Sequence, residues 1–456
     1  MASIALIAHR TPDAVLAYRD GAATSARTFL ADVANVAARM PAGKNVLNAC
    51  KDRYHFTVGF AASVLSHRMS LLPSTHTPQV IQQLAEFSPD VFCLTDDPQC
   101  DIDLPQFHYP EESLHDTADR PIPQIDVQRR VACVFTSGST GAPIPHIKTW
   151  GRLAACVREG ASRLGILDGR SHAILATVPA QHMYGFESTV LTPLQSGNAL
   201  CAERPFYPAD ICSSFAQLPR PRVLISTPIH LRTLLATDID MPEADLIVSA
   251  TAPLSPELAR AAEQRFNSTL IEVYGSTETG QIATRRTAQT REWQLWSDVQ
   301  LSVQDDRVSA HGGHIEQLTL MGDVIEITGP QHFLLHGRTA DLVNIAGKRG
   351  SLGYLNHQLN SIPGVLDGVF FLRDEDSGKN GVSRLAAVVV APSLDAAALL
   401  DRLRERIDPV FLPRPLLFVE RLPRSASGKL PRQALLSLAA RTAECAPVED
   451  TPPWAR

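Results

Sequence analysis

The chain has 456 residues, which is too long for one ordinary hydrophobic core and predicts two or three domains. Hydrophobic residues make up 44% of it and charged residues 20%, as in soluble globular proteins, and the formal net charge of −6 gives no electrostatic reason to expect nucleic-acid binding. No apolar run approaches the length of a membrane span, and the start lacks the basic lead-in of a signal peptide. The eight cysteines form no C-x-x-C pair and several lie in apolar runs, so a reducing, cytoplasmic setting is expected.

Over the first 330 residues, short apolar runs alternate with helical patterns. Residues 56–65 and 78–87 have helical patterns, and strand-like runs follow them at 70–73 and 90–94. This alternation predicts βα units with mostly parallel sheets, so we expect a large N-terminal α/β domain. Two further buried strands are expected, at 173–178 and 222–226.

The pattern changes near residue 318. Short strands to residue 335 predict a small β-barrel-like subdomain, and a compact α+β unit follows a boundary at 338–341. That unit is expected to contain helices at 352–362 and 395–407 and strands at 342–346, 365–373, 385–390 and 416–419. We therefore expect a large domain over 1–337, a hinge at 338–341, a small C-terminal domain over 342–440 and a tail over 441–456.

The most informative segment follows the apolar run 131–135. Four hydroxyl side chains and two glycines fall within six residues: Thr136, Ser137, Gly138, Ser139, Thr140 and Gly141. Glycines allow the backbone to approach a ligand closely, and hydroxyl and backbone N–H groups can then converge on phosphate oxygens. The segment is not a Walker A loop, because the Lys that must directly follow the second Gly is absent. Taken alone, it is more often a Ser/Gly surface turn.

Three later segments favour the phosphate-loop interpretation. Tyr274–Thr279 carries Glu278 in a small, hydroxyl-rich loop, and such a carboxylate suits Mg²⁺ bound together with substrate phosphates, although a lone Glu is usually a solvated charge. His336–Asp341 runs into Val343–Gly350, and Leu422–Leu430 places Lys429 on a Ser/Gly loop.

In this order and spacing, the four segments resemble the adenylate-forming (AMP-binding) superfamily of acyl-CoA and aryl-CoA synthetases, luciferases and peptide-synthetase adenylation domains. The resemblance extends from about residue 10 to about residue 440. It implies a large N-terminal domain and a small mobile C-terminal lid. It also implies ATP-dependent activation of a carboxylic acid with release of pyrophosphate, then thioester formation on CoA or on the phosphopantetheine of an acyl carrier protein.

The resemblance also implies roles for individual residues. The ATP/AMP site would comprise Thr136, Ser137, Gly138, Ser139, Thr140, Gly141, Lys148, Thr251, Ala252, Tyr274, Gly275, Ser276, Asp323 and Arg338. Lys429, Thr277 and Glu278 would be catalytic, with Glu278 also the Mg²⁺ ligand. His182, Tyr184 and Gly185 would border the acyl pocket, and Gly347 and Arg349 would face the thiol acceptor. Each of four residues has a simpler alternative. Asp323 would be a turn residue and His182 a structural side chain. Arg338 and Arg349 would be surface charges.

The chemistry explains why cations are needed. A carboxylate attacking the α-phosphate brings two anions together, and unit charges 4 Å apart repel by about 1 kcal/mol in water and about 4 kcal/mol at an effective dielectric of 20. Mg²⁺ on Glu278 and the ammonium of Lys429 would offset this repulsion, since a Lys with pKa ~10.4 is charged at neutral pH.

Several departures from the family pattern bear on activity. The Lys that usually ends the phosphate loop is replaced by Ile144, so either Lys148 takes over or the loop binds triphosphate through its backbone and hydroxyls alone. The hinge position normally occupied by Asp or Lys is Ala340. These two features favour a second class of function, an adenylate-binding or carrier-docking protein with impaired catalysis. A third class, a P-loop NTPase or kinase, is excluded because the Lys that would directly follow Gly141 is missing and because of the C-terminal loop with Lys429.

The acid itself is only partly constrained. No Asp lies between residues 175 and 200 to hold an amino group, and Glu187 is a poor substitute, so an acid without an α-amino group is expected. Residues 141–150 resemble the loop of stand-alone ligases from aryl-polyene and related pigment pathways. This favours an aromatic acid such as a hydroxybenzoate, or a medium acyl chain, and slightly favours a carrier protein as acceptor. The pairs His311/His314 and His332/His336 lack supporting ligands, and no metal is expected there.

Overall fold

The computed structural model describes residues 2–73, 75–110, 120–137, 143–304, 307–338, 342–345, 348–372, 385–424, 430–431 and 434–438. The chain divides into two compact units. The first consists of Met1–Met321 and Ile327–Leu334, and the second of Gly322–Glu326 and Leu335–Arg456. This division falls close to the hinge expected at 338–341, of which positions 339–341 lie outside the described residues.

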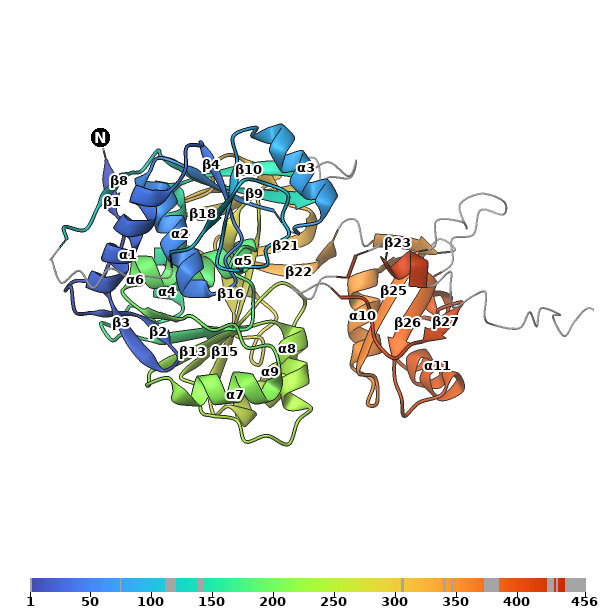
Figure 1. Cartoon of the computed structure of the whole chain (residues 1–456). Helices are drawn as coiled ribbons and strands as arrows, with labels where there is room; N and C mark the ends of the chain where they lie inside the picture. The colour runs from blue at the N-terminus through green and yellow to red at the C-terminus, as the bar shows by residue number, and fades with distance from the viewer. Residues whose placement is uncertain are drawn as a thin grey trace, which may run out of the picture. The chain divides into compact units, whose positions relative to one another are not determined.

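The smaller sheet of the first unit has six strands in the order β10–β9–β5–β4–β6–β7 (Figure 1). They are β4 (Asn45–Asn48), β5 (Met69–Leu72), β6 (Phe92–Thr95), β7 (Gln106–His108), β9 (Arg130–Ser137) and β10 (Pro143–Thr149). Neighbours are parallel except β10, which pairs antiparallel with β9 and sets Thr136 opposite Ile144 and Val134 opposite His146.

The larger sheet has eleven strands in the order β21–β22–β17–β16–β15–β14–β13–β11–β12–β2–β3. They are β2 (Val15–Arg19), β3 (Ala22–Ser25), β11 (Ala173–Ala176), β12 (Ala199–Cys201), β13 (Arg222–Ser226), β14 (Leu246–Ser249), β15 (Thr269–Ser276), β16 (Gly280–Arg285), β17 (Trp293–Leu295), β21 (Asp323–Gly329) and β22 (His332–Arg338). The run from β15 to β2 is parallel. Within this sheet, β2 comes earliest in the chain, and it pairs with β12 through Ala17 and Leu200.

Helices cover both faces of these sheets. They are α1 (Ala26–Arg39), α2 (Arg53–Leu65), α3 (Pro78–Phe87), α4 (Trp150–Arg163), α5 (Met183–Gly185), the π-helical η1 (Phe186–Leu191), α6 (Thr192–Ser196), α7 (Pro208–Gln217), α8 (Pro228–Leu235) and α9 (Pro256–Arg265). Figure 1 shows α7, α8 and α9 together beside β13 and β15, where Phe215, Leu231 and Ala259 pack on Leu224 and Leu270. Because both faces are covered, β11, β13 and β14 are buried throughout and read as continuous apolar runs.

Helix α2 lies between the two sheets and contacts β4 and β5 on one side and β12 on the other. Its first residue, Arg53, is 2% exposed. The guanidinium of Arg53 donates to the carbonyls of Ala176 and Val178 at 3.2 and 2.9 Å, and of Cys201 and Glu203 at 3.2 and 3.3 Å. One buried side chain therefore ties the carboxyl ends of β11 and β12 together.

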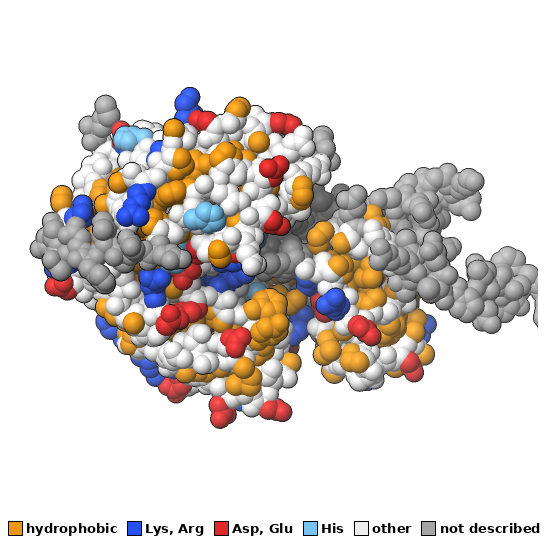
Figure 2. All heavy atoms as spheres, in the orientation of Figure 1, with side chains coloured by type: hydrophobic (Ala, Val, Ile, Leu, Met, Phe, Trp, Pro, Cys, Tyr) orange, Lys and Arg blue, Asp and Glu red, His pale blue; other side chains and the backbone are white. Residues whose placement is uncertain are grey.

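Two short antiparallel sheets complete the first unit. One pairs β1 (Ser3–Ala5) with β8 (Gln124–Asp126), and the other consists of β18 (Val299–Gln304), β19 (Arg307–Gly312) and β20 (Thr319–Leu320). None of the helices in the described ranges has the length and apolar character needed to cross a membrane. On the face drawn in Figure 2, cationic and anionic side chains are interspersed over the first unit.

The second unit is an α+β fold with its own core. It contains β23 (Leu342–Ile345), β24 (Lys348–Ser351), α10 (Leu352–Asn360), β25 (Asp367–Leu372), β26 (Leu385–Val390), α11 (Ala396–Arg404), the short 3₁₀ helix η4 (Pro409–Phe411) and β27 (Leu416–Phe418). Leu359, Phe370, Val389 and Leu403 are in the core that joins its helices to its sheet. The expected fold class is confirmed: a large, mostly parallel α/β part and a separate small α+β part.

Candidate active site

The predicted nucleotide residues of the first unit lie where strands of the two sheets end. Thr136 lies near the carboxyl end of β9 and Tyr274 near that of β15, and Ala250 directly follows β14. This is the edge where open α/β sheets bind ligands. Gly138, Ser139, Thr140 and Gly141 are outside the described residues, and only the backbone of Ser137 is described.

The loop after β14 has a strained backbone. Thr251 is exposed and has φ of +81°, which costs a residue with a Cβ of order 1–3 kcal/mol and persists only where the surroundings impose it. The N–H of Leu254, at the end of the loop, donates to Glu272 Oε1 at 3.2 Å. This bond ties the end of the loop that carries Thr251 and Ala252, two predicted ATP/AMP-site residues, to the neighbouring strand β15.

Glu272 is itself held by a buried network. Its Oε2 accepts from Arg285 Nε at 2.7 Å and from Thr287 Oγ1 at 2.6 Å, and Arg285 lies 4.3 Å above the ring centre of Trp293. Burial raises the pKa of Glu272, and the Arg285 charge opposes this. The sequence motifs do not include Glu272; its position as a carboxylate within the apolar run of β15 is the signal that marks it.

The turn between β15 and β16 presents Thr277 and Glu278. The Ser276 N–H donates to Thr279 Oγ1 at 3.1 Å, and the Thr279 N–H donates to Ser276 Oγ at 3.2 Å. A Cβ at Gly275 would lie 2.2 Å from the Gly280 carbonyl oxygen, so a glycine is needed for the hairpin to close. Before the turn, the ring centre of Tyr274 lies 5.5 Å from that of Trp293.

His146 connects the phosphate loop to this turn. Its Nε2 lies 2.9 Å from Thr136 Oγ1 and 3.6 Å from Glu278 Oε1. Burial lowers the pKa of His146, although the Glu278 charge acts in the opposite direction, so the neutral imidazole is favoured at neutral pH. His146 is not among the residues predicted from the sequence; its position on β10, two residues before Lys148 and so on the same face of the strand, is the signal that marks it.

Lys148 contacts the same turn from the interior of the first unit. It is 6% exposed, and its Nζ donates to the backbone carbonyl of Glu278 at 2.9 Å. Burial lowers the pKa of Lys148, and the carboxylate of Glu187 opposes the change. The described contact of Lys148 is therefore with the turn that carries Glu278.

Glu187 lies on η1 and is 2% exposed. The Cys156 thiol donates to its Oε1 at 3.0 Å, and burial raises the pKa of Glu187 to about 7. A Cβ at Gly280 would lie 2.8 Å from Glu187 Oε1. The carboxylate is therefore directed into a buried cluster between α4 and β16.

The predicted acyl segment is built into the core. The Tyr184 hydroxyl donates to the carbonyls of Ser226 and Val248, both at 3.2 Å, and so joins the ends of β13 and β14. A Cβ at Gly185 would lie 1.9 Å from the Pro179 carbonyl oxygen, so only glycine allows this approach. His182 is half-buried, and its carbonyl accepts the N–H of Phe186 at 2.7 Å.

The remaining predicted residues belong to the second unit. Asp323 is half-buried at the start of β21. Arg338 ends β22 and Arg349 lies on β24 opposite Asn344, but neither side chain is described. Gly347, Ala340 and Lys429 lie outside the described residues. Their roles stay predictions.

No metal centre is formed by the described residues, since none of their His, Cys, Asp and Glu side chains gather in groups of three or more suited to a metal. His336 pairs with Glu326 at 2.8 Å, and His314 packs against Trp296 with ring centres 5.1 Å apart.

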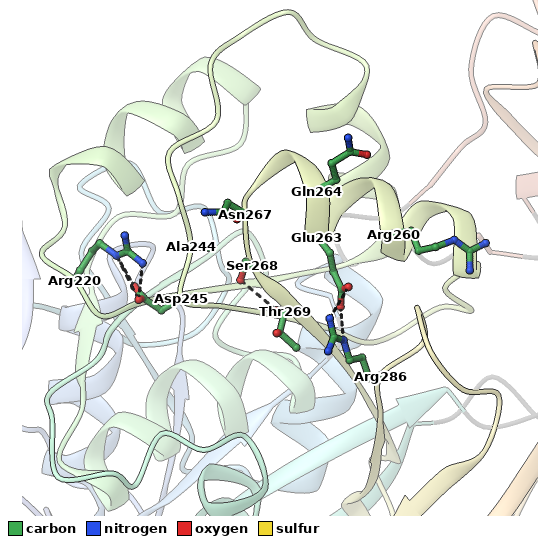
Figure 3. Close-up of a pocket in the computed structure, with 10 residues that line it drawn as sticks. All are labelled: Arg220, Ala244, Asp245, Arg260, Glu263, Gln264, Asn267, Ser268, Thr269 and Arg286. Carbon is green, nitrogen blue, oxygen red and sulfur yellow. Dashed lines mark hydrogen bonds and ion pairs between the residues drawn. The ribbon is translucent and has the colours of Figure 1, made fainter.

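A surface hollow of about 570 Å³ lies elsewhere, near the amino ends of β14 and β15 (Figure 3). Its arginines are paired with carboxylates: Arg220 contacts Asp245 at 2.8 Å and Arg286 contacts Glu263 at 2.9 Å. Because ligands of parallel sheets bind at the opposite edge, this hollow is not the candidate active site.

Comparison with known proteins places the chain in a family. Residues 3–308 match the family described as AMP-binding enzyme. The chain is 30% identical over 338 residues to a 4-coumarate–CoA ligase of Rhodobacter capsulatus, covering 72% of this chain and 83% of that protein. It is 24% identical over 345 residues to a 4-hydroxybenzoate–CoA/benzoate–CoA ligase of Rhodopseudomonas palustris, covering 66% and 63%.

The fold agrees with this placement. The structure of the o-succinylbenzoate CoA synthetase of Bacillus subtilis with its acyl-adenylate has a TM-score of 0.80 at 17% identity, covering 95% of this chain and 98% of that one. The chain belongs to the AMP-binding enzyme family of adenylate-forming enzymes. It is an AMP-forming acid–thiol ligase.

Proposed function

We propose that this enzyme uses ATP and Mg²⁺ to convert an aromatic carboxylic acid to an acyl-adenylate, releases pyrophosphate, and passes the acyl group to a pantetheine thiol. One observation carries the proposal. The start of the phosphate loop and the acidic turn meet through His146, which lies within 2.9 Å of Thr136 and 3.6 Å of Glu278. Two segments 130 or more residues apart thus come together, which supports a shared role toward the ATP phosphates.

The Glu278 carboxylate fits a magnesium ion. It is 40% exposed on a turn fixed by reciprocal Ser276 and Thr279 bonds, and Mg²⁺ typically takes one or two protein carboxylates together with substrate phosphates. When bound there, Mg²⁺ would neutralise phosphate charge. The Thr136 hydroxyl would orient phosphate oxygens, while the loop carrying Thr251 and the ring of Tyr274 would border the adenine.

The proposed acid is aromatic and carries no α-amino group. Among relatives of this chain, those named for 4-coumarate and for 4-hydroxybenzoate or benzoate act on aromatic acids. Glu187, the carboxylate nearest the acyl segment in sequence, is buried against Cys156 and beside Gly280, which supports an acid without an amino group for it to bind. A medium acyl chain remains the second candidate.

The acceptor is either CoA or a carrier protein, which present the same pantetheine arm. The relatives' names favour CoA, whereas the pigment-pathway resemblance of residues 141–150 favours a carrier protein. If CoA is the acceptor, Arg349→Ala should raise the KM for CoA and spare adenylation, because it removes a cation from the proposed phosphate contact.

We also propose a cytoplasmic location, supported by seven free cysteines among the described residues.

The proposal is tested by carboxylate-dependent release of pyrophosphate from ATP. Aromatic acids with and without ring hydroxyls, medium-chain acids and amino acids are screened, and CoA or a holo-carrier protein is then supplied. Release with an aromatic acid supports the proposal. ATP binding without release under any acid would favour the impaired adenylate-binding protein suggested by Ile144 and Ala340.

A further inference from the structure

A buried cationic side chain lies directly behind the turn that presents Glu278. The residues 144, 146 and 148 alternate along β10 and share one face, opposite Thr136, Val134 and Ala132 of β9. On this face Ile144 is 49% exposed, His146 is partly buried and Lys148 is buried. The face therefore passes from solvent to the interior, and Lys148 is at its inner end.

The ammonium of Lys148 is committed to the backbone of the turn. Its described hydrogen bond goes to the Glu278 carbonyl, at 2.9 Å. A buried ammonium is strongly unfavourable unless it is hydrogen-bonded and its charge is compensated. With 6% exposure, Lys148 has little access to a triphosphate in solvent.

Glu187, whose pKa burial raises to about 7, offsets part of the Lys148 charge through its ionised form and lies beside the other end of the turn. Its attraction for Lys148 is the largest effect opposing burial of that ammonium. The carboxylate also occupies the space beside Gly280, where an added Cβ would approach it to 2.8 Å. Lys148 thus contacts the turn at Glu278, while Glu187 abuts the turn at Gly280.

We propose that Lys148 is a positioning residue, which with Glu187 fixes the Ser276–Gly280 turn so that the Glu278 carboxylate faces His146 and Thr136. Lys148 does not replace the phosphate-loop lysine that is absent at Ile144. This inference rests on the proposed function, in which Glu278 binds Mg²⁺. Outer partners that orient metal ligands typically contribute about 10–100-fold in metal affinity or activity.

The main variant is Lys148→Met, which keeps the stem and removes the charge. The Mg²⁺ concentration for half-maximal adenylation should rise about 10-fold or more, whereas thioester formation from presynthesised acyl-adenylate should be spared. A second readout is independent of turnover: the Mg²⁺-dependent part of the rise in Tm produced by ATP should shrink. Lys44→Met, which changes an exposed lysine in the same way, should alter none of these.

Glu187→Gln separates positioning from a general structural role. It should raise the Mg²⁺ requirement less than Lys148→Met does. The double variant should be less impaired than the sum of the single ones predicts, because the change at Glu187 removes the buried carboxylate that Lys148→Met alone would leave without its counter-charge. If Lys148→Met does not fold, Glu187→Gln alone decides: an unchanged Mg²⁺ requirement would overturn the proposal.

Two other results would also overturn it. A raised KM for ATP with an unchanged Mg²⁺ requirement would make Lys148 a phosphate ligand. Equal loss of both half-reactions would make it merely structural. Failure of the proposed function is distinguishable, because the wild-type enzyme would then release no pyrophosphate while the Tm response to ATP and Mg²⁺ would still report on the turn.

Discussion

Replacing Glu272 with Gln should lower both the stability of the first unit and its use of ATP. The carboxylate is 3% exposed and accepts three hydrogen bonds, from Leu254, Arg285 and Thr287. Removing its charge leaves the Arg285 guanidinium, itself 14% exposed, without a counter-charge above Trp293. Breaking a buried pair in this way costs about 3–5 kcal/mol, and we expect about 3 because Gln keeps some of the hydrogen bonds.

This magnitude converts into a measurable change in Tm. The first unit has about 330 residues, and an unfolding entropy of about 2.1 cal/mol/K per residue gives about 0.7 kcal/mol/K. The Tm should therefore fall by about 4 °C in a thermal melt. Because the Leu254 bond fixes the loop of Thr251 and Ala252, the KM for ATP in pyrophosphate release should rise severalfold, while the KM for the acid should change little.

Glu263→Gln is the matched control. Glu263 also accepts from an arginine and from a backbone N–H, Arg286 and Leu270, but near the amino end of β15. It should reduce the Tm without changing the KM for ATP. A fall of less than about 1 °C for Glu272→Gln, or an effect on ATP equal to that of the control, would refute the reasoning.

Three further predictions follow from the site and the core. Lys429→Ala should abolish adenylation and leave thioester formation from presynthesised acyl-adenylate largely intact, as measured by the two half-reactions. Glu278→Gln should raise the Mg²⁺ requirement of pyrophosphate release, because it removes the charge of the proposed ligand and keeps its shape. Burial lowers the pKa of His9 to about 4, so below its ordinary value of 6.5 the unfolded chain binds a proton that the folded protein does not. Stability is therefore complete above pH 6.5 and falls as the pH drops toward 4, by about 2 kcal/mol at pH 5 from this group; denaturant melts of the wild type and His9→Gln should differ in this slope.

Each of these has a contrary outcome. Equal loss of both half-reactions in folded Lys429→Ala would exclude a role confined to adenylation. An unchanged Mg²⁺ titration would show that Glu278 is not the ligand. The same pH slope in His9→Gln as in the wild type would show that His9 does not govern acid sensitivity, and His314, whose pKa burial also lowers to about 4, would be the next group to replace.

The strands of the sheets were predictable from the sequence where both of their faces are buried, because such strands must be largely apolar throughout. The apolar runs at 173–178 and 222–226 predict the fully buried strands β11 and β13. The start of α2 was missed because a charged residue, Arg53, opens it. That charge is acceptable only because four carbonyls from distant strands surround it, which no local pattern shows.

The candidate site was predictable only in part, for a similar reason. Thr136 and Glu278 lie in short motifs whose composition indicates phosphate and Mg²⁺. The residues that hold Thr136 and Glu278 in place do not lie in such motifs. His146 depends on the register of β10 against β9, and Lys148 and Glu187 depend on which elements pack behind the turn. These relations arise from tertiary pairing, so a single sequence carries little trace of them.

The pairing of β2 with β12 has a consequence for how the chain folds during synthesis. Val15–Arg19 emerges from the ribosome early, but its parallel partner around Leu200 is made some 180 residues later. Synthesis at about 5–20 residues per second leaves β2, which can pair early with β3, without its parallel partner β12 for about 10–40 s. The Arg53 guanidinium lacks two of its acceptors, the carbonyls of Cys201 and Glu203, for nearly as long. The first 200 residues therefore cannot complete their fold as an independent piece, because one edge of β2 and the Arg53 guanidinium gain these partners only when β12 has emerged.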